Sequence, residues 1–147
     1  MTDKPTCGPL YLEGLDKYTG GDPEKIRIYA AAFCAGQAEK VCLGACRAAM
    51  FRPSADRFTM LIAVVCDVAK RYGLTVYVRP AYNPETKHAG REIWICRSKW
   101  LDDIEELENL KENSPAWHHK RAWLCGIPQE EVDVEFHERS GAGQRCD

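Results

Sequence analysis

Residues 54–79, SADRFTMLIAVVCDVAKRYGLTVYVR, decide the fold, because a helical pattern changes here into the pattern of a strand. Apolar residues recur every three or four positions from Phe58 to Tyr72, as they do on the buried side of a helix. Gly73 follows, and glycine readily takes the left-handed conformation that ends many helices. Leu74–Arg79 then alternates with a period of two and is rich in β-branched and aromatic residues, which predicts a strand.

A second strand is expected at Glu92–Arg97, EIWICR, which alternates in the same way. Between the two strands, Pro80–Arg91 contains prolines and glycine and predicts a long, mobile hairpin loop. One side of the hairpin would then carry Leu74, Val76, Val78, Ile93 and Ile95. The other side would carry Tyr77, Arg79 and Trp94. A short edge strand at Pro9–Glu13 would complete a small sheet.

A long helix is expected from Pro23 to about Met50, because Asp22 is a favoured N-cap residue and proline suits the first helical position. Gly36 or Gly44 would bend or divide this helix. Small residues recur along it at every fourth position: Ala30, Cys34, Ala38, Cys42 and Cys46. This ridge is interpreted as core packing, with an interface between copies of the chain as the alternative. Further helices are expected over Lys99–Lys111, Pro115–Cys125 and Pro128–Glu138.

Length and composition predict a single α+β domain over residues 1–147, mainly helical, with a small antiparallel hairpin or three-stranded sheet. Residues 1–8 and 140–147 are expected to be flexible. The net charge of −2 offers no electrostatic basis for general nucleic-acid binding. The most apolar run, Met60–Cys66, is far too short to span a bilayer. No signal peptide is recognised at the first residues, so a cytoplasmic location is expected.

Eight cysteines, at positions 7, 34, 42, 46, 66, 96, 125 and 146, call for an explanation. Reduced thiols packed as small apolar groups are favoured for a cytoplasmic chain that can build a core without cross-links. A zinc site is the alternative, although the cysteine and histidine spacing matches no standard zinc motif. We therefore expect no metal and no cofactor.

The familiar catalytic motifs of nucleotide hydrolases, dinucleotide enzymes, serine hydrolases and zinc peptidases do not occur in the sequence. A first candidate site lies on the hairpin, where Tyr77 and Trp94 would meet across the strands beside Arg79, with Arg91 nearby. Aromatic faces with cations close by can stack a base and neutralise a phosphate. The alternative interpretation is a cross-strand aromatic pair that stabilises the hairpin.

A second candidate site lies in the C-terminal part, where two pairs of residues are each spaced by one helical turn. Asp133 could orient and charge the imidazole of His137, and Trp117 and Arg121 could stack on each other. If the two helices pack together, His118 and Arg121 would lie close to Asp133 and His137. A general acid–base pair could then form among these residues. The alternative interpretation is a polar network that fixes the turn between the helices.

One further pattern occupies the last third of the chain and runs through Asn113-Ser114-Pro115-Ala116-Trp117-His118, Arg121, Leu124-Cys125-Gly126-Ile127-Pro128, Asp133, Phe136-His137, Arg139 and Gly141. In this pattern the chain resembles small uncharacterised proteins encoded by bacteriophages and prophages. The resemblance implies a viral or mobile-element origin and the cytoplasm of a host cell as the setting. It implies no particular activity and no catalytic residues.

These observations favour a non-enzymatic accessory protein of the phage type, which holds a host protein or sequesters a small anionic ligand such as a signalling nucleotide. The ligand contacts would then be Tyr77, Arg79, Arg91, Trp94 and Arg121. The alternative is a small acid–base enzyme, a hydrolase or lyase acting on a phosphate ester. Its candidate catalytic residues are His118, Asp133 and His137. Neither a membrane nor nucleic acid in general is an expected partner, and a homo-oligomer is compatible with the sequence.

Overall fold

The computed structural model describes residues 19–83 and 88–128. Its longer elements follow one another along the chain as α2 (Pro23–Cys42), β1 (Ala48–Phe51), α3 (Phe58–Tyr72), β2 (Thr75–Asn83), β3 (His88–Cys96), α4 (Leu101–Glu105) and α5 (Pro115–Leu124). Short 3-10 helices occupy Ala55–Arg57, Ser98–Trp100 and Glu106–Asn109. Helices and antiparallel strands are combined in one fold, which confirms the expected α+β class.

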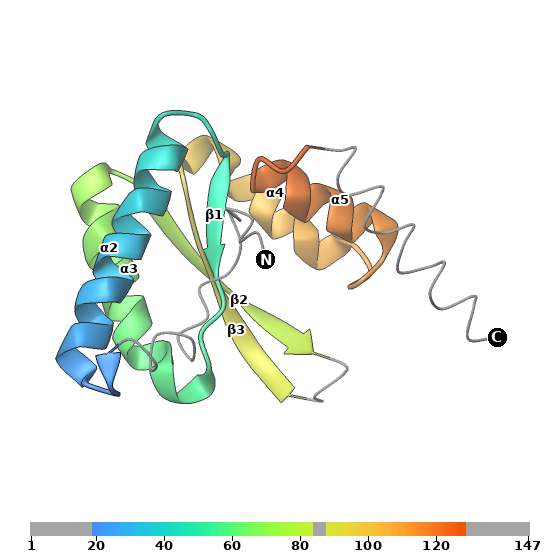
Figure 1. Ribbon diagram of the computed structural model, residues 1–147. Coiled ribbons are helices and arrows are strands. Elements are labelled where there is room, and N and C mark those ends of the chain that lie inside the picture. The colour runs from blue at the N-terminus through green and yellow to red at the C-terminus, as the bar shows by residue number, and fades with distance from the viewer. Residues whose placement is uncertain (1–18, 84–87, 129–147) are drawn as a thin grey trace.

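The sheet has three antiparallel strands in the order β1-β3-β2, so β3 is the central strand. Helices α2 and α3 cover one face of this sheet, and α4 and α5 cover the other (Figure 1). The described part of the chain therefore has two apolar cores, one on each side of β3. No helix within residues 19–83 and 88–128 is long and apolar enough to cross a membrane.

Alternation along β3 assigns its side chains to the two cores. Ile93 and Ile95 are fully buried against α2 and α3, whereas Trp94 and Cys96 belong to the core under α4 and α5. In the strand register Val76 lies opposite Ile95, and Tyr77 lies opposite Trp94. The predicted division of the hairpin into an apolar face and a face with Tyr77, Arg79 and Trp94 is thereby confirmed.

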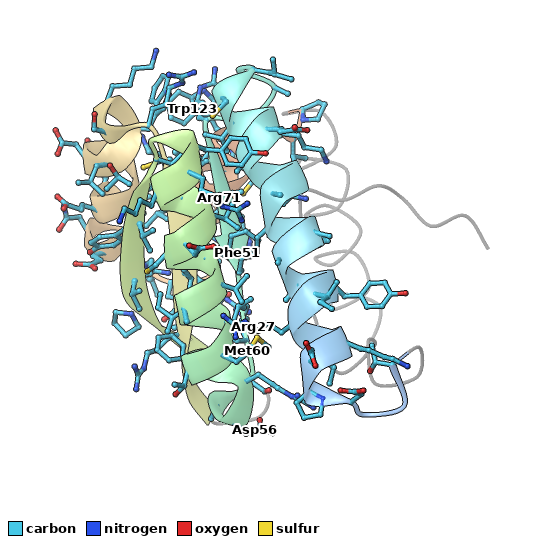
Figure 2. All side chains as sticks on the ribbon, turned by 90° about the vertical axis from the view of Figure 1, so that its left-hand side faces the viewer. Arg27, Phe51, Asp56, Met60, Arg71 and Trp123 are labelled. Carbon is cyan, nitrogen blue, oxygen red and sulfur yellow. The ribbon has the colours of Figure 1, made fainter. Side chains whose placement is uncertain are left out.

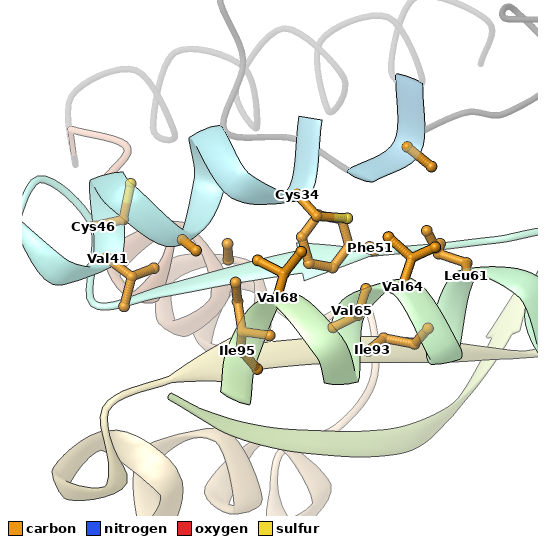
Figure 3. Packing of buried hydrophobic residues seen from close by; sticks show 14 of the residues in the cluster. Cys34, Val41, Cys46, Phe51, Leu61, Val64, Val65, Val68, Ile93 and Ile95 are labelled. Carbon is orange, nitrogen blue, oxygen red and sulfur yellow. The ribbon is translucent and has the colours of Figure 1, made fainter. Parts of the chain in front are cut away.

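The ridge of small residues on α2 lies in the first core. Ala30, Cys34 and Ala38 are each fully buried, and they pack in one cluster with the valines of α3 and with Phe51 of β1 (Figure 3). Figure 2 views this layer from outside, with α2 and α3 side by side and Phe51 between them. The interpretation as core packing is confirmed. The ridge is not available to a second copy of the chain, so that alternative was wrong.

Helix α2 is shorter than the helix predicted from Pro23 to about Met50. Its start is confirmed, because the Asp22 side chain accepts a hydrogen bond of 3.0 Å from the backbone of Glu24. The helix ends at Cys42, and Gly44 has a φ of 81° in the turn that follows. Residues 48–51 then form β1, which is buried on both faces and pairs with β3. A strand buried on both faces lacks the polar–apolar alternation by which strands are recognised in a sequence.

The prediction of a long loop over Pro80–Arg91 was also wrong. Strands β2 and β3 continue through this segment, with Pro80 opposite Arg91 and the last pair at Asn83 and His88. The strand β2 lies at the edge of the sheet, where a proline without an N–H group is tolerated.

Helix α5 begins and ends as the sequence predicts. The Ser114 side chain accepts a hydrogen bond of 3.2 Å from the backbone of Trp117, and Pro115 is the first helical residue. After the helix, Gly126 has a φ of 75°, and a Cβ atom there would lie 2.6 Å from the carbonyl oxygen of Ala45. The end of α5 is thus pressed against the loop between α2 and β1.

Of the remaining predicted elements, one is shorter than expected and the others lie wholly or mostly outside the described residues. The helix expected over Lys99–Lys111 is reduced to α4 and its flanking 3-10 turns, which end at Asn109. The strand expected at Pro9–Glu13 and most of the helix expected at Pro128–Glu138 fall outside residues 19–83 and 88–128, as do the termini 1–8 and 140–147.

Candidate functional site

The central strand β3 carries a buried acidic residue, Glu92, with one arginine on β2 and another directly after β1. Arg79 of β2 is the register partner of Glu92. On the other side Phe51 pairs with Ile93, so Arg52, which follows β1, comes next to Glu92. These side chains project from the same face of the sheet as Trp94, toward α5.

A third arginine reaches the same carboxylate from α5. Arg79 Nη1 donates to Glu92 Oε1 over 2.8 Å, and Arg121 Nη1 donates to the same oxygen over 2.7 Å. Arg52 Nη2 donates to the other oxygen, Oε2. The indole Nε1 of Trp94 lies 3.3 Å from Oε1 and adds a further donor. We refer to Arg52, Arg79, Glu92 and Arg121 as the arginine cluster.

Two tryptophans hold Arg121 in place. Its guanidinium carbon lies 4.2 Å from the ring centroid of Trp117 and 5.6 Å from that of Trp94. The predicted stacking of Trp117 and Arg121, one helical turn apart, is therefore confirmed. Because cations bind the faces of aromatic rings, this contact fixes the guanidinium in the position from which it reaches Glu92.

The electrostatics of the cluster depend on its burial. Glu92 is fully buried, and Arg79 is only 5% exposed. Burial alone would raise the pKa of the Glu92 carboxyl, but the charges and hydrogen bonds of Arg121 and Arg52 outweigh that effect and lower the pKa to about 2. The carboxylate is therefore ionised at neutral pH.

The cluster carries more positive than negative charge. Three guanidinium groups against one carboxylate leave two positive charges uncompensated within the cluster. The buried Nε atoms of Arg52 and Arg79 have no hydrogen-bond partner among the described residues. The cluster reaches solvent at Arg52, whose side chain is 35% exposed, whereas that of Arg121 is 14% exposed.

The other predicted ligand contacts are arranged differently. Trp94 is fully buried beneath α4 and α5, so its ring has no open face for a stacked base, and that part of the prediction was wrong. The hydroxyl of Tyr77 donates to Glu108 over 2.6 Å, and this hydrogen bond raises the pKa of Tyr77 to about 12. Arg91 lies on the opposite side of β3, with its guanidinium carbon 4.3 Å from the ring centroid of Phe58. Of the five predicted contacts, Arg79, Trp94 and Arg121 are the ones that meet at Glu92.

The predicted acid–base group can be placed only in part. His118 lies on α5, and its ring meets the neighbouring Trp117 ring edge-on at 4.9 Å between centroids. Asp133 and His137 lie outside the described residues. The convergence of these three residues stays a prediction.

Several of the described cysteines pack as small apolar groups, as predicted. The six that the structure describes are reduced thiols, and Cys34, Cys46, Cys96 and Cys125 are buried. Burial raises the pKa of Cys34 to about 12 and that of Cys96 to about 11, which suppresses the reactive thiolate. Residues 19–83 and 88–128 contain no group of three or more side chains arranged to hold a metal ion.

Sequence reasoning missed two members of the cluster. Glu92 was used only to mark the start of a strand, and the register that sets Tyr77 opposite Trp94 also sets Glu92 opposite Arg79. Arg52 was missed because the strand before it was interpreted as the end of a helix.

The chemistry of the cluster follows from its donors. A guanidinium group presents five N–H donors in a planar fork that matches the oxygens of a carboxylate or phosphate, and Glu92 accepts only one of them from each arginine. The arrangement is suited to holding an oxyanion. Comparisons of the chain with models of protein families, with curated proteins and with solved structures give no match.

Proposed function

We propose that the protein binds a small dianionic ligand, such as a phosphate monoester, and that the arginine cluster is the anchor for its charged group. The observation that carries the proposal is the excess of two positive charges around the buried Glu92. Charges removed from water are costly unless they are paired, so an uncompensated buried guanidinium group favours the arrival of an anion. A dianion would neutralise the cluster.

Hydrogen bonding supports the same ligand class. The Nε of Arg79 is buried and unpartnered in the described part of the chain, as is the Nε of Arg52. Guanidinium groups bind phosphate through parallel N–H donors, and such charge-assisted hydrogen bonds are about twice as strong as neutral ones. Arg52 would be the first contact, because it is the most exposed member of the cluster.

The buried position of Trp94 limits the kind of ligand. Since its ring is covered, a nucleotide would be anchored through its phosphate rather than through a base stacked on the hairpin. The predicted phage origin, the cytoplasmic setting and the holding of a host protein stay predictions that rest on the sequence alone. The acid–base enzyme also stays a prediction, because two of its three candidate residues lie outside the described chain.

Isothermal titration calorimetry with inorganic phosphate and with adenosine monophosphate would test this proposal. We expect saturable binding that becomes tighter as the pH rises from about 5 to about 7, because phosphate monoesters gain their second negative charge near a pKa of about 6. Chloride and acetate, which are monoanions, should bind much more weakly than either phosphate ligand.

A matched pair of arginine variants separates the cluster from general surface charge. Arg52→Gln removes a cluster arginine, whereas Arg71→Gln removes an exposed arginine of α3, whose only described ion pair is a 3.6 Å contact with Asp67. Losing a hydrogen bond to a charged group costs about 1.5–3 kcal/mol, so Arg52→Gln should weaken phosphate binding by about 10- to 100-fold. Arg71→Gln should bind as the wild type does. The proposal fails if no phosphate compound binds, or if both variants keep the wild-type affinity.

A further inference from the structure

Helix α2 carries a continuous line of exposed residues on the side turned away from its buried face. We call this line the outer stripe; it consists of Lys25, Tyr29, Ala32, Gly36, Glu39 and the capping residue Leu43. Tyr29 is 50% exposed, Leu43 is 85% exposed, and Ile28 beside the stripe is 61% exposed. The intervals along the stripe are alternately four and three residues, which is the spacing of residues that form a seam between paired helices.

Nothing in residues 19–83 and 88–128 accounts for Gly36 at the middle of the stripe. It lies in the interior of α2 without a positive φ, and a Cβ atom there would meet no described residue within 4 Å. Glycine in the interior of a helix is less stable than alanine by about 0.5–1 kcal/mol. A glycine at this position would allow the close approach of another backbone from outside.

We propose that the outer stripe is the interface of a homodimer, in which α2 packs antiparallel against α2 of a second copy. A two-fold axis midway between Ala32 and Gly36 sets Ala32 opposite the partner's Gly36 and Tyr29 opposite the partner's Glu39. It also sets Lys25 opposite the partner's Leu43. Since the intervals of the stripe read the same in both directions, every stripe residue meets a stripe residue, as an isologous interface requires.

The side chains of the outer stripe are suited to this pairing in their size and polarity. The small residues Ala32 and Gly36 at its centre would let the two helix axes approach to about 8 Å. Toward each end, the exposed side chains of Ile28, Tyr29 and Leu43 would be removed from water. Their burial would be the main favourable contribution to the free energy of dimerisation.

Charge complementarity selects the antiparallel orientation. Lys25 lies in the N-terminal half of the stripe and Glu39 in the C-terminal half, and both are exposed. In the antiparallel pair each Lys25 comes within one helical turn of the partner's Glu39, and the symmetry forms this contact twice. A parallel pair would instead set lysine against lysine and glutamate against glutamate, which is unfavourable.

Sedimentation velocity of the full chain, from micromolar to millimolar concentration, tests the dimer directly. We expect the mass of two chains at high concentration, and dissociation on dilution. Gly36→Gln places a bulky side chain at the centre of the seam, where the single chain has room for it, so this variant should fold and sediment as one chain. The matched control is Ala63→Gln, the same type of replacement at an exposed position of α3, which should dimerise as the wild type does.

Charge reversal tests the orientation. Lys25→Glu or Glu39→Lys alone would create like-charge contacts twice in the dimer and should raise its dissociation constant by about tenfold. The double variant carrying both changes restores opposite charges and should recover wild-type association. A single-chain mass for the wild type at every concentration would overturn the proposal. So would wild-type dimerisation by Gly36→Gln, or a double variant no tighter than the two single ones.

Discussion

Replacing Glu92 with glutamine should strongly destabilise the protein, because it leaves three arginines around a neutral amide. The magnitude follows from the shift of the Glu92 pKa from its ordinary value of 4.5 to about 2. This shift corresponds to about 3 kcal/mol of stabilisation of the folded state by the ionised carboxylate. Breaking a buried ion pair by removing one partner typically costs about 3–5 kcal/mol, which agrees with that value.

Urea unfolding at neutral pH, followed by tryptophan fluorescence in a buffer without phosphate, measures this loss. The matched control is Glu105→Gln, the same change at an exposed position of α4, which should alter the free energy of unfolding by less than about 0.5 kcal/mol. The tryptophans next to the cluster make the fluorescence sensitive to its opening.

The pH dependence gives an independent measurement of the same quantity. The pKa of Glu92 is lower in the folded chain than in the unfolded chain, so unfolding takes up a proton in acid. The stabilisation is complete above about pH 5 and is lost progressively as the pH falls toward about 2. Glu92→Gln should lack this part of the pH dependence. The reasoning is refuted if the variant unfolds within about 0.5 kcal/mol of the wild type, or if both proteins lose the same stability in acid.

Three further substitutions and one labelling experiment test the fold. Gly126→Ala should cost more than about 2 kcal/mol, because its positive φ is combined with a carbonyl oxygen 2.6 Å from the new Cβ atom. Gly73→Ala, at a φ of 68° but in open space, should cost only about 1 kcal/mol, and equal losses in urea unfolding would contradict the close contact. Asp22→Ala should lower stability by about 1 kcal/mol in the same assay, since it removes the cap of α2. Native alkylation read by mass spectrometry should modify the exposed Cys66 well before the buried Cys34, and equal rates would contradict the packing of the core.

Local signals were sufficient to predict most of the helices. The cap at Asp22, the left-handed Gly73 and the Ser114-Pro115 start each depend on a few neighbouring residues, and each lies where the sequence predicts. The two faces of the hairpin could also be predicted, because alternation depends only on the pleat of the strand.

Features that depend on tertiary pairing could not be predicted from local patterns. Ala48–Phe51 consists of residues compatible with a helix, and only its pairing with the central strand makes it β1. The candidate site depended on that pairing, since Arg52 reaches Glu92 through it. Arg79, Trp94 and Arg121 were recognised from their chemistry, whereas the acidic residue that joins them became evident only from the register.

The contacts of Glu92 also suggest an order of assembly. Arg79 is separated from Glu92 by 13 residues and joins it when the β2–β3 hairpin forms, whereas Arg52 is separated from it by 40. Closing the longer loop costs more chain entropy, so β1 should dock onto a hairpin that already exists. Until β1 docks, one edge of the central strand β3 is open to pairing with other chains. The rate at which β1 docks therefore sets how long a newly made molecule is prone to aggregation.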